Sequence, residues 1–304
     1  MNNPILNKSF FAIEGGGTKF LIAHFDENCQ ELARKTIATK EPEQTLGDCV
    51  AFIKDRLPGK EHLAGLGIAH FGPLSILPDA PDYGKLRETP KVAWSHFDVL
   101  GFFKQSLGDD FPIIIDTDVN GAVLAETRWG AGKGLKNVLY LTIGTGIGGG
   151  AIVNRKLLYG YAHTEMGHIA IPRLPNDTFA GICPAHGDCF EGLCTGPAIA
   201  VRWDRPATDL PDKHPAWPLE AAYIAKALRN YAYVLAPERI VLGGGVMNRR
   251  FLFPLIREAF KREMAGYGET ISDLKNYIVP SEFKGDAGLF GALCLILDFL
   301  TIQN

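Results

Sequence analysis

The sequence of 304 residues lacks a basic run, a leader and any apolar stretch long enough to span a membrane. The longest apolar stretch, 289–302, is interrupted by Asp298 and is shorter than a bilayer requires. The opening residues MNNPILNKSF have neither the charged start nor the apolar core of a signal peptide. The formal net charge is -3, which does not favour binding to a phosphate backbone. We therefore expect a cytoplasmic protein whose partners are neither membranes nor nucleic acids.

Cysteine is too sparse for a disulfide-stabilised fold. The chain has six cysteines, and without a secretion signal they indicate thiols or metal ligands. Apolar residues make up 46% of the chain and charged residues 21%, which is an ordinary globular composition and excludes disorder. The length allows one large domain or two moderate ones.

Two patterns of strand, glycine turn and strand, at 13–26 and 141–154, form a weak internal repeat. Each opens a region of strands and helices, so we predict an α/β protein with two related lobes and a cleft between them. Residues 1–120, completed by 287–304, would form the N-terminal lobe, and residues 121–286 the C-terminal lobe. The other predicted elements are strands at 64–71, 112–115 and 239–242, helices at 120–129, 219–235 and 287–300, and irregular segments at 78–94 and 172–193.

Three glycine-rich turns predict a phosphate site. Glycine allows the close backbone approach and inward-pointing N–H groups that the phosphates of a nucleotide require. The turns lie at 15–19, 144–150 and 243–245. One such turn alone is more often a tight hairpin, but three together favour nucleotide binding.

Two rival nucleotide motifs fail on context. Gly144, Gly146 and Gly149 satisfy G-x-G-x-x-G, but β-branched residues follow and predict a strand, whereas a dinucleotide fingerprint opens a helix. The segment GAGKG at 130–134 lacks the spacing and the hydroxyl residue of a P-loop, and we interpret it as a surface turn.

An acidic pair follows the predicted strand 112–115. Alternation along a strand would place Asp116 and Asp118 on the same side, facing the cleft. A carboxylate that orients a hydroxyl and accepts its proton suits phosphoryl transfer. Acidic residues at the start of a helix are more often caps, and the pattern alone favours that alternative.

A dense group of metal-binding residues lies in and beside the irregular segment 172–193. Its members, spaced H-x14-C-x2-H-x2-C, are His168, Cys183, His186 and Cys189. Two thiolates and two imidazoles suit tetrahedral zinc, and four protein ligands leave no position for an activated water. We therefore predict a structural zinc that orders a loop at 168–194. The alternatives are a disulfide between the two cysteines or unrelated surface thiols, and Cys194 and His163 lie nearby as substitute ligands.

Together these segments resemble the ROK family of bacterial sugar kinases and, within it, the zinc-containing fructokinases. The resemblance runs from Ile13 to about Gly291. Its motifs are IEGGGTK at 13–19, FGP at 71–73, TPKVAW at 89–94, DTDVNGAVLAE at 116–126, TIGTGIGGG at 142–150, HTEMGHI at 163–169, CPAHGDCFEG at 183–192, TGPAI at 195–199 and VLGGGVM at 241–247. Their common order and spacing make the resemblance specific.

The resemblance implies an actin-like fold of two RNase H-like lobes that close on ATP and sugar, in a chain that forms a homodimer. It assigns the role of general base to Asp118. It places at the sugar Gly72, Glu165, His168 and Glu191, with Thr89, Pro90 and Trp94 on a flap over it. It places at ATP Gly16, Gly17, Thr18, Lys19, Thr145, Gly146, Pro197, Gly243, Gly244, Gly245 and Val246.

Three positions depart from the broad family. Glu14 stands where most members have Asp, although fructokinase relatives also carry Glu, and a contact between Glu14 and magnesium is left open. Thr117 replaces the Asn of many glucose-type members and favours the fructokinase branch. The segment GKLRE at 84–88 is more charged than that branch leads us to expect, which bears on the choice of sugar.

We therefore expect phosphoryl transfer from ATP to D-fructose, giving fructose 6-phosphate, with Mg²⁺ on the phosphate oxygens and Zn²⁺ as a structural ion. One alternative is a kinase of mannose, glucose or an N-acetyl hexosamine. Another is a sugar-responsive regulator, but the twelve residues before Ile13 leave no room for a DNA-binding module. A zinc-dependent hydrolase would need an open position on the metal.

Overall fold

The computed structural model describes residues 8–56, 63–89, 91–267 and 271–302, which form two compact units. The N-terminal unit comprises residues within 1–125, 159–163 and 286–304, and the C-terminal unit comprises residues within 126–158 and 164–285. The division therefore falls between Ala125 and Glu126, inside helix α3 (Asp118–Arg128). The segment 159–163 belongs to the N-terminal unit, although the chain on both sides of it belongs to the other.

A five-stranded mixed sheet forms the centre of the N-terminal unit. Its strands are β1 (Ser9–Gly15), β2 (Lys19–Phe25), β3 (Glu31–Ala38), β4 (Leu63–His70) and β5 (Ile113–Thr117). They lie in the order β3-β2-β1-β4-β5. The strand β1 pairs antiparallel with β2 and parallel with β4, and β4 pairs parallel with β5.

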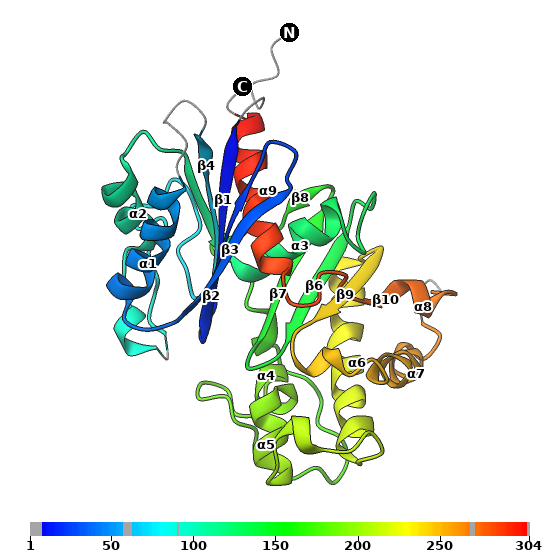
Figure 1. The fold of residues 1–304 in the computed structure, drawn as a ribbon. Coiled ribbons are helices and arrows are strands. Elements are labelled where there is room, and N and C mark those ends of the chain that lie inside the picture. Colours follow the sequence, from blue (N-terminus) through cyan, green and yellow to red (C-terminus); the bar gives the residue numbers. More distant parts are fainter. Residues whose placement is uncertain (1–7, 57–62, 90, 268–270, 303–304) are drawn as a thin grey trace. The chain divides into compact units, whose positions relative to one another are not determined.

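Helices cover both faces of this sheet, with α1 (Pro42–Asp55) and α2 (Val99–Leu107) on one side and α9 (Ala287–Ile302) on the other (Figure 1). Side chains of β1 alternate accordingly: Phe11 and Ile13 pack with α1 and α2, whereas Phe10 and Ala12 pack with α9. The helix α9 approaches closely, since a Cβ on Gly67 of β4 would lie 1.8 Å from the carbonyl oxygen of Ala292. Only glycine fits at that crossing.

The sheet of the C-terminal unit repeats this topology. Its strands are β6 (Val138–Ile143), β7 (Ile147–Val153), β8 (Lys156–Leu157), β9 (Arg239–Gly243) and β10 (Ile278–Pro280). They lie in the order β10-β9-β6-β7-β8, so β6 has the place of β1 between an antiparallel and a parallel neighbour. The predicted internal repeat is confirmed at the level of strand order.

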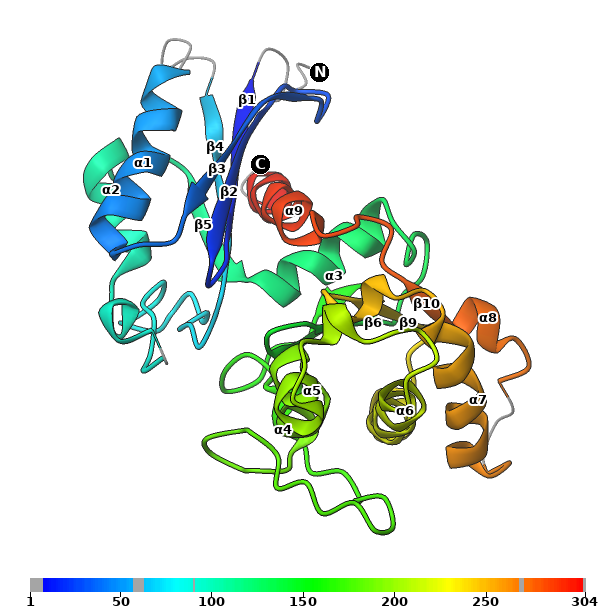
Figure 2. The ribbon, with the colours of Figure 1, turned by 60° about the horizontal axis from the view of Figure 1, so that its bottom comes forward.

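One large core holds the C-terminal unit together. Its helices are α4 (Phe190–Cys194), α5 (Gly196–Trp203), α6 (Ala216–Leu235), α7 (Leu252–Met264) and α8 (Leu274–Tyr277). The long helix α6 lies beside α7 in both views and buries Trp217, Tyr223 and Leu228 (Figure 2). The predicted irregular segment 172–193 has no helix or strand as far as Cys189, but α4 begins inside it at Phe190. Among the helices of the described residues, none is both long and apolar enough to cross a membrane.

Candidate active site

The turn between β1 and β2 is compact and presents its tip to solvent. The N–H of Gly16 donates to the carbonyl of Lys19 at 3.0 Å, and the hydroxyl of Thr39 donates to the carbonyl of Gly16 at 2.7 Å. A Cβ on Gly16 would lie 2.7 Å from the Lys19 carbonyl oxygen, so the turn excludes a larger residue. Gly17, Thr18 and Lys19 are exposed. The predicted phosphate-binding residues of this unit thus offer open backbone, a hydroxyl and a cation, which suits an anion.

Asp116 lies at the end of β5 and is only 3% exposed. Its Oδ1 accepts hydrogen bonds from the N–H of Thr117 at 2.6 Å and from the side-chain amide of Asn120 at 2.8 Å. Its Oδ2 accepts one from the hydroxyl of Tyr159 at 2.5 Å. Burial raises the pKa of Asp116, although these hydrogen bonds oppose the shift. This carboxylate is therefore a buried structural group.

Asp118 is the first residue of α3 and is half-buried. Its Oδ1 accepts from the N–H of Val119 at 2.9 Å. The prediction that both acids follow strand alternation is wrong, because β5 ends at Thr117 and Asp118 already belongs to the helix. The N–H of Asn120 donates to the hydroxyl oxygen of Thr117 at 3.2 Å, so the threonine caps this turn.

Glu14 lies on β1 against the start of α9. A Cβ on Gly288 would lie 2.6 Å from its carboxyl carbon, and its buried Oε2 has no hydrogen-bond partner within the described part of the chain. Burial, followed by the charges of Asp118 and Asp286, raises the pKa of Glu14 to about 7. Asp286 already pairs with Arg34 at 2.7 Å, and the charge of Lys19 opposes the shift of Glu14, so the negative charge near Glu14 is compensated in part by cations of the same unit.

Trp94 is a core residue of the N-terminal unit. It is 2% exposed, its indole N–H donates to the carbonyl of Lys40 at 2.9 Å, and its ring stacks on Phe20. The resemblance placed Trp94 on a flap over the sugar, and in this structure its ring is buried inside the unit. Thr89 is also buried, and its N–H donates to the hydroxyl of Ser95 at 3.1 Å. Pro90 lies outside the described residues.

Three segments of the C-terminal unit converge where ATP is predicted to bind. The N–H of Gly196, at the start of α5, donates to the carbonyl of Gly144 at 2.8 Å. A Cβ on Gly144 would lie 3.4 Å from the backbone nitrogen of Gly245. Gly244 has φ +90°, and a Cβ there would lie 2.4 Å from the carbonyl oxygen of Ile143. The turn with Thr145 and Gly146, the helix with Pro197 and the turn 243–246 thus lie together.

The four predicted metal ligands also come together. The ligand atoms of His168, Cys183, His186 and Cys189 all lie within 4.8 Å of one another. Nδ1 of His168 is 3.6 Å from Sγ of Cys183 and 3.7 Å from Sγ of Cys189. A tetrahedral ion at about 2.3 Å from sulfur and about 2.1 Å from nitrogen would separate such atoms by roughly 3.5 Å, so the cluster fits zinc.

The alternative ligands and the disulfide find no support. All six cysteines are free thiols, so Cys183 and Cys189 are not joined. Cys194 is buried in the apolar core, and His163 belongs to the other unit. Burial and the neighbouring Cys183 thiol raise the pKa of Cys189 to about 11, and a cation bound beside it would oppose this shift and favour the thiolate.

His168 uses its two ring nitrogens differently. Nδ1 faces the thiols, whereas Nε2 lies 3.9 Å from Oε1 of Glu191. Oε2 of Glu191 accepts from the N–H of Ile147 at 2.9 Å and lies beside Gly146. The glycine turn of β6 and β7 is therefore tied to the metal cluster through one carboxylate. Glu165 is exposed one turn before His168, whose N–H donates to its carbonyl at 3.1 Å.

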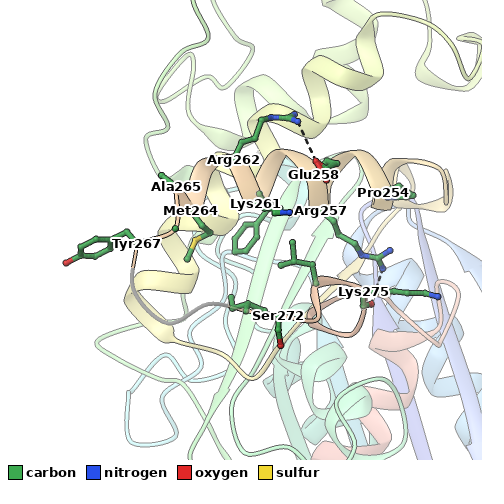
Figure 3. A pocket seen from close by; sticks show the side chains of 14 residues that line it. Pro254, Arg257, Glu258, Lys261, Arg262, Met264, Ala265, Tyr267, Ser272 and Lys275 are labelled. Atoms are coloured by element: carbon green, nitrogen blue, oxygen red, sulfur yellow. Dashed lines mark hydrogen bonds and ion pairs between the residues drawn. The ribbon is translucent and has the colours of Figure 1, made fainter.

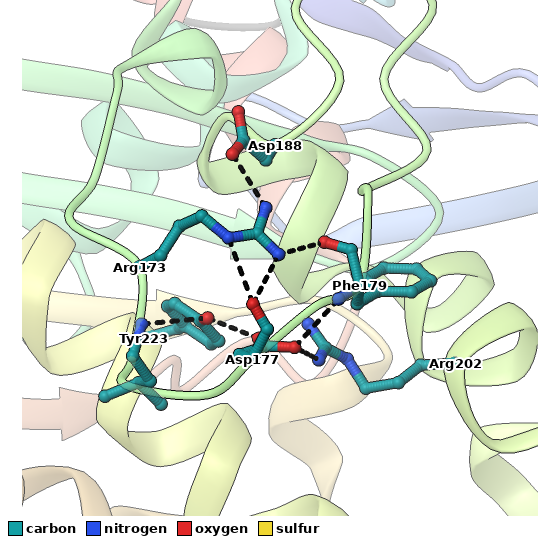
Figure 4. A network of polar contacts seen from close by, with 7 residues as sticks. Arg173, Asp177, Phe179, Asp188, Arg202 and Tyr223 are labelled. Atoms are coloured by element: carbon teal, nitrogen blue, oxygen red, sulfur yellow. Dashed lines mark hydrogen bonds and ion pairs between the residues drawn. The ribbon is translucent and has the colours of Figure 1, made fainter.

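A polar network that no local sequence pattern indicates holds the loop of the candidate metal ligands (Figure 4). Arg173 donates to Oδ2 of Asp188 at 2.7 Å and to the carbonyl of Asp177 at 2.8 Å. Asp177 in turn accepts from Arg202 of α5 at 2.6 Å and from the hydroxyl of Tyr223 of α6. The residue before the ligand Cys189 is thus anchored to two helices.

A cavity of about 770 Å³ lies between α7 and α8, away from these groups (Figure 3). Its walls combine apolar side chains with cations, among them Phe260, Met264, Leu274, Lys261 and Lys275. Arg257 at its edge donates to the carbonyl of Ile278 at 2.7 Å. No residue predicted to bind ATP, sugar or metal lines this cavity, and we assign it no function.

The family follows from comparison with known proteins. Residues 10–298 match the ROK family. The chain belongs to the ROK family. A fructokinase of Pediococcus pentosaceus is 40% identical to this ROK protein over 284 residues, covering 93% of this chain and 96% of the relative. A fructokinase of Zymomonas mobilis is 41% identical over 294 residues, covering 95% and 97%.

A solved structure extends the comparison to the fold. The ROK hexokinase of Thermus thermophilus has a TM-score of 0.76 to this chain at 24% identity, covering 96% of this chain and 99% of the other. This likeness shows the shared fold. The predicted actin-like architecture of two α/β lobes is thereby confirmed for this ROK protein.

Proposed function

We propose that this ROK protein is a fructokinase, which transfers the terminal phosphoryl group of ATP to D-fructose and forms ADP and fructose 6-phosphate. The observation that carries the proposal is the 40–41% identity to two fructokinases over at least 93% of the chain. The geometry agrees with it, because each unit carries an exposed glycine turn and one of them presents a half-buried carboxylate at a helix start. We further propose a cytoplasmic homodimer, in line with the family resemblance.

In this proposal Asp118 orients the 6-hydroxyl of the sugar and accepts its proton. The carboxylate of Asp116 is unsuited to that role, because it is buried and accepts three hydrogen bonds. Gly72, Glu165, His168 through Nε2, and Glu191 hold the other hydroxyls. Thr89 and Trp94 support the wall from inside the N-terminal unit, where both are buried.

The backbone turns bind the nucleotide. The N–H groups of Gly16 and Gly144 donate within their own turns. In this proposal the exposed residues Gly17, Thr18, Thr145 and Gly146 turn their backbone toward phosphate oxygens, and Lys19 adds a positive charge. Pro197 and residues 243–246 flank the adenosine. A Mg²⁺ ion, when bound, neutralises the charge that develops on the phosphate oxygens.

We propose that the cluster of His168, Cys183, His186 and Cys189 holds Zn²⁺. Zinc would close the loop and fix the imidazole of His168, so that Nε2 and Glu191 keep their orientation toward the sugar. The cluster offers four protein ligands, which suits a structural ion.

The charge of the segment 84–88, which is unexpected for a fructokinase, is partly neutralised within the N-terminal unit. Nζ of Lys85 lies 3.7 Å from Oδ2 of Asp98, and Nη2 of Arg87 lies 3.5 Å from Oδ2 of Asp82. Both cations therefore pair with acids of their own unit. Because of this pairing, we keep fructose as the proposed substrate despite the charge of the segment.

An assay of ADP release with fructose, mannose, glucose and N-acetylmannosamine tests the proposal. We expect the highest kcat/KM with fructose, and a higher value with another hexose would replace the assigned substrate. In the same assay Asp118→Asn should lower kcat by about 10²–10⁴-fold and change both KM values only a few-fold. Near-normal turnover in this variant would move the role of base to another group.

A further inference from the structure

The segment 159–163, here called the strap, packs on the N-terminal unit at two functional places. At one end the hydroxyl of Tyr159 donates to Oδ2 of Asp116 at 2.5 Å. At the other end Nε2 of His163 accepts from the N–H of Leu74 at 3.3 Å, and a Cβ on Gly72 would lie 3.6 Å from the same ring. The strap therefore touches the strand end that precedes Asp118 and the loop assigned to the sugar.

The carboxylate of Asp116 connects Tyr159 with the start of α3. While Oδ2 binds Tyr159, Oδ1 binds Thr117 and Asn120, which lie on either side of Asp118 in the sequence. A hydroxyl donor at this distance from a carboxylate is a strong, charge-assisted hydrogen bond.

Tyr159 is suited to act as the donor of this bond. Its residue surface is 44% exposed, but its hydroxyl reaches a carboxylate that is 3% exposed. Burial and the charge of Asp116 raise the pKa of Tyr159, so its hydroxyl keeps the proton that it donates.

We propose that Tyr159 is a positioning residue for phosphoryl transfer. Its hydroxyl fixes the carboxylate of Asp116, which fixes the first turn of α3 and hence the carboxylate of Asp118. The proposal rests on the proposed role of Asp118 as the general base. Without the hydroxyl, the buried Oδ2 of Asp116 loses this donor, and the carboxyl group must rotate or bind a proton, which loosens the turn.

The variant Tyr159→Phe removes the hydroxyl and keeps the ring. We expect kcat to fall by about 10–100-fold, because a misplacement of about 1 Å in a reacting group can cost 10²-fold. The KM values for fructose and ATP should stay within about twofold, since Tyr159 contacts neither proposed binding segment through its hydroxyl. If Tyr159 had only a structural role, the variant would melt at a lower temperature, and kcat would not fall selectively while the KM values stayed the same.

Two further variants connect the effect to Asp116 and provide a control. The double variant Tyr159→Phe with Asp116→Asn should be no slower than Asp116→Asn alone, because both changes break the same chain of bonds. Tyr161→Phe changes a tyrosine of the same strap that is 97% exposed, and its kinetics should equal those of the unchanged protein.

Unchanged kcat in Tyr159→Phe would overturn the proposal, as would independent, multiplicative losses in the double variant or an equal loss in Tyr161→Phe. Asp118→Asn is measured alongside to separate the two ideas. If Asp118→Asn is inactive while Tyr159→Phe is fully active, only the role of Tyr159 fails. If Asp118→Asn retains turnover, the proposed base fails.

Discussion

Replacement of Glu14 by glutamine should stabilise the protein above neutral pH and change little in acid. Burial and the charges of Asp118 and Asp286 raise the pKa of Glu14 from 4.5 to about 7. A carboxyl group with a raised folded-state pKa contributes stability that is fully present below its unfolded pKa and is lost as the pH rises through its folded pKa. The relevant window therefore runs from about pH 4.5 to about pH 7.

The size of the effect follows from the shift. A difference between 4.5 and about 7, at about 1.4 kcal/mol for each pKa unit, costs the folded chain about 3.5 kcal/mol once Glu14 is ionised. Glutamine has nearly the same shape and no ionisation, so it removes this cost. The gain should reach about 3.5 kcal/mol above pH 8 and be small at about pH 4.5.

Urea unfolding of the chain at these two pH values, without nucleotide and with magnesium removed, measures the difference. Glu88→Gln provides the matched control, since Glu88 is exposed and its replacement should change neither value. If Glu14→Gln is no more stable than the unchanged protein above pH 8, the raised pKa and the electrostatic reasoning built on it are refuted.

Three further perturbations test the two units. Chelation of the metal, or the variant Cys183→Ser, should lower both the melting temperature and the activity, because the binding free energy of a structural metal is part of the folding free energy. Metal analysis that finds no zinc, together with unchanged melting of the variant, would contradict this. Trp94→Ala should lower the unfolding free energy, measured in urea, by about 3–5 kcal/mol, because the ring is buried. A variant that melts normally but hydrolyses more ATP for each sugar phosphorylated would instead favour a role of Trp94 in covering the sugar. Arg173→Met should cost about 1–3 kcal/mol and speed the loss of zinc to a chelator, whereas the exposed Arg205→Met should do neither.

The sequence was most informative where structure depends on local pattern. The hairpins around the glycine turns and the long helix α6 carry their periodicity within a few residues, and all were predicted. Helices α1 and α7 were not predicted, although both are amphipathic and bury one face. The four candidate metal ligands do come together as expected, because they are dense in sequence and their chemistry is distinctive, whereas the zinc itself stays a prediction.

Features that depend on distant contacts could not be predicted. The strand β5 runs two residues past its predicted end, which moves Asp116 into the sheet and Asp118 into the helix. Trp94 was placed on a flap over the sugar by resemblance alone, and no local pattern indicated that its partners would come from β2 and the residue Lys40. The hydroxyl of Tyr159 binds a carboxylate 43 positions away, and no local signal marks that bond.

The discontinuous path of the N-terminal unit has a consequence for synthesis on the ribosome. Its first strands emerge early, but one face of their sheet is covered by α9, whose Leu289, Leu293 and Ile296 share an apolar cluster with Phe10. Domains usually complete folding in the order of translation. Here the C-terminal unit has all of its residues by Gly285, whereas the N-terminal unit needs the segment that begins at Asp286. The unit that starts first is therefore expected to finish last, and one apolar face of its sheet stays uncovered until α9 has been synthesised.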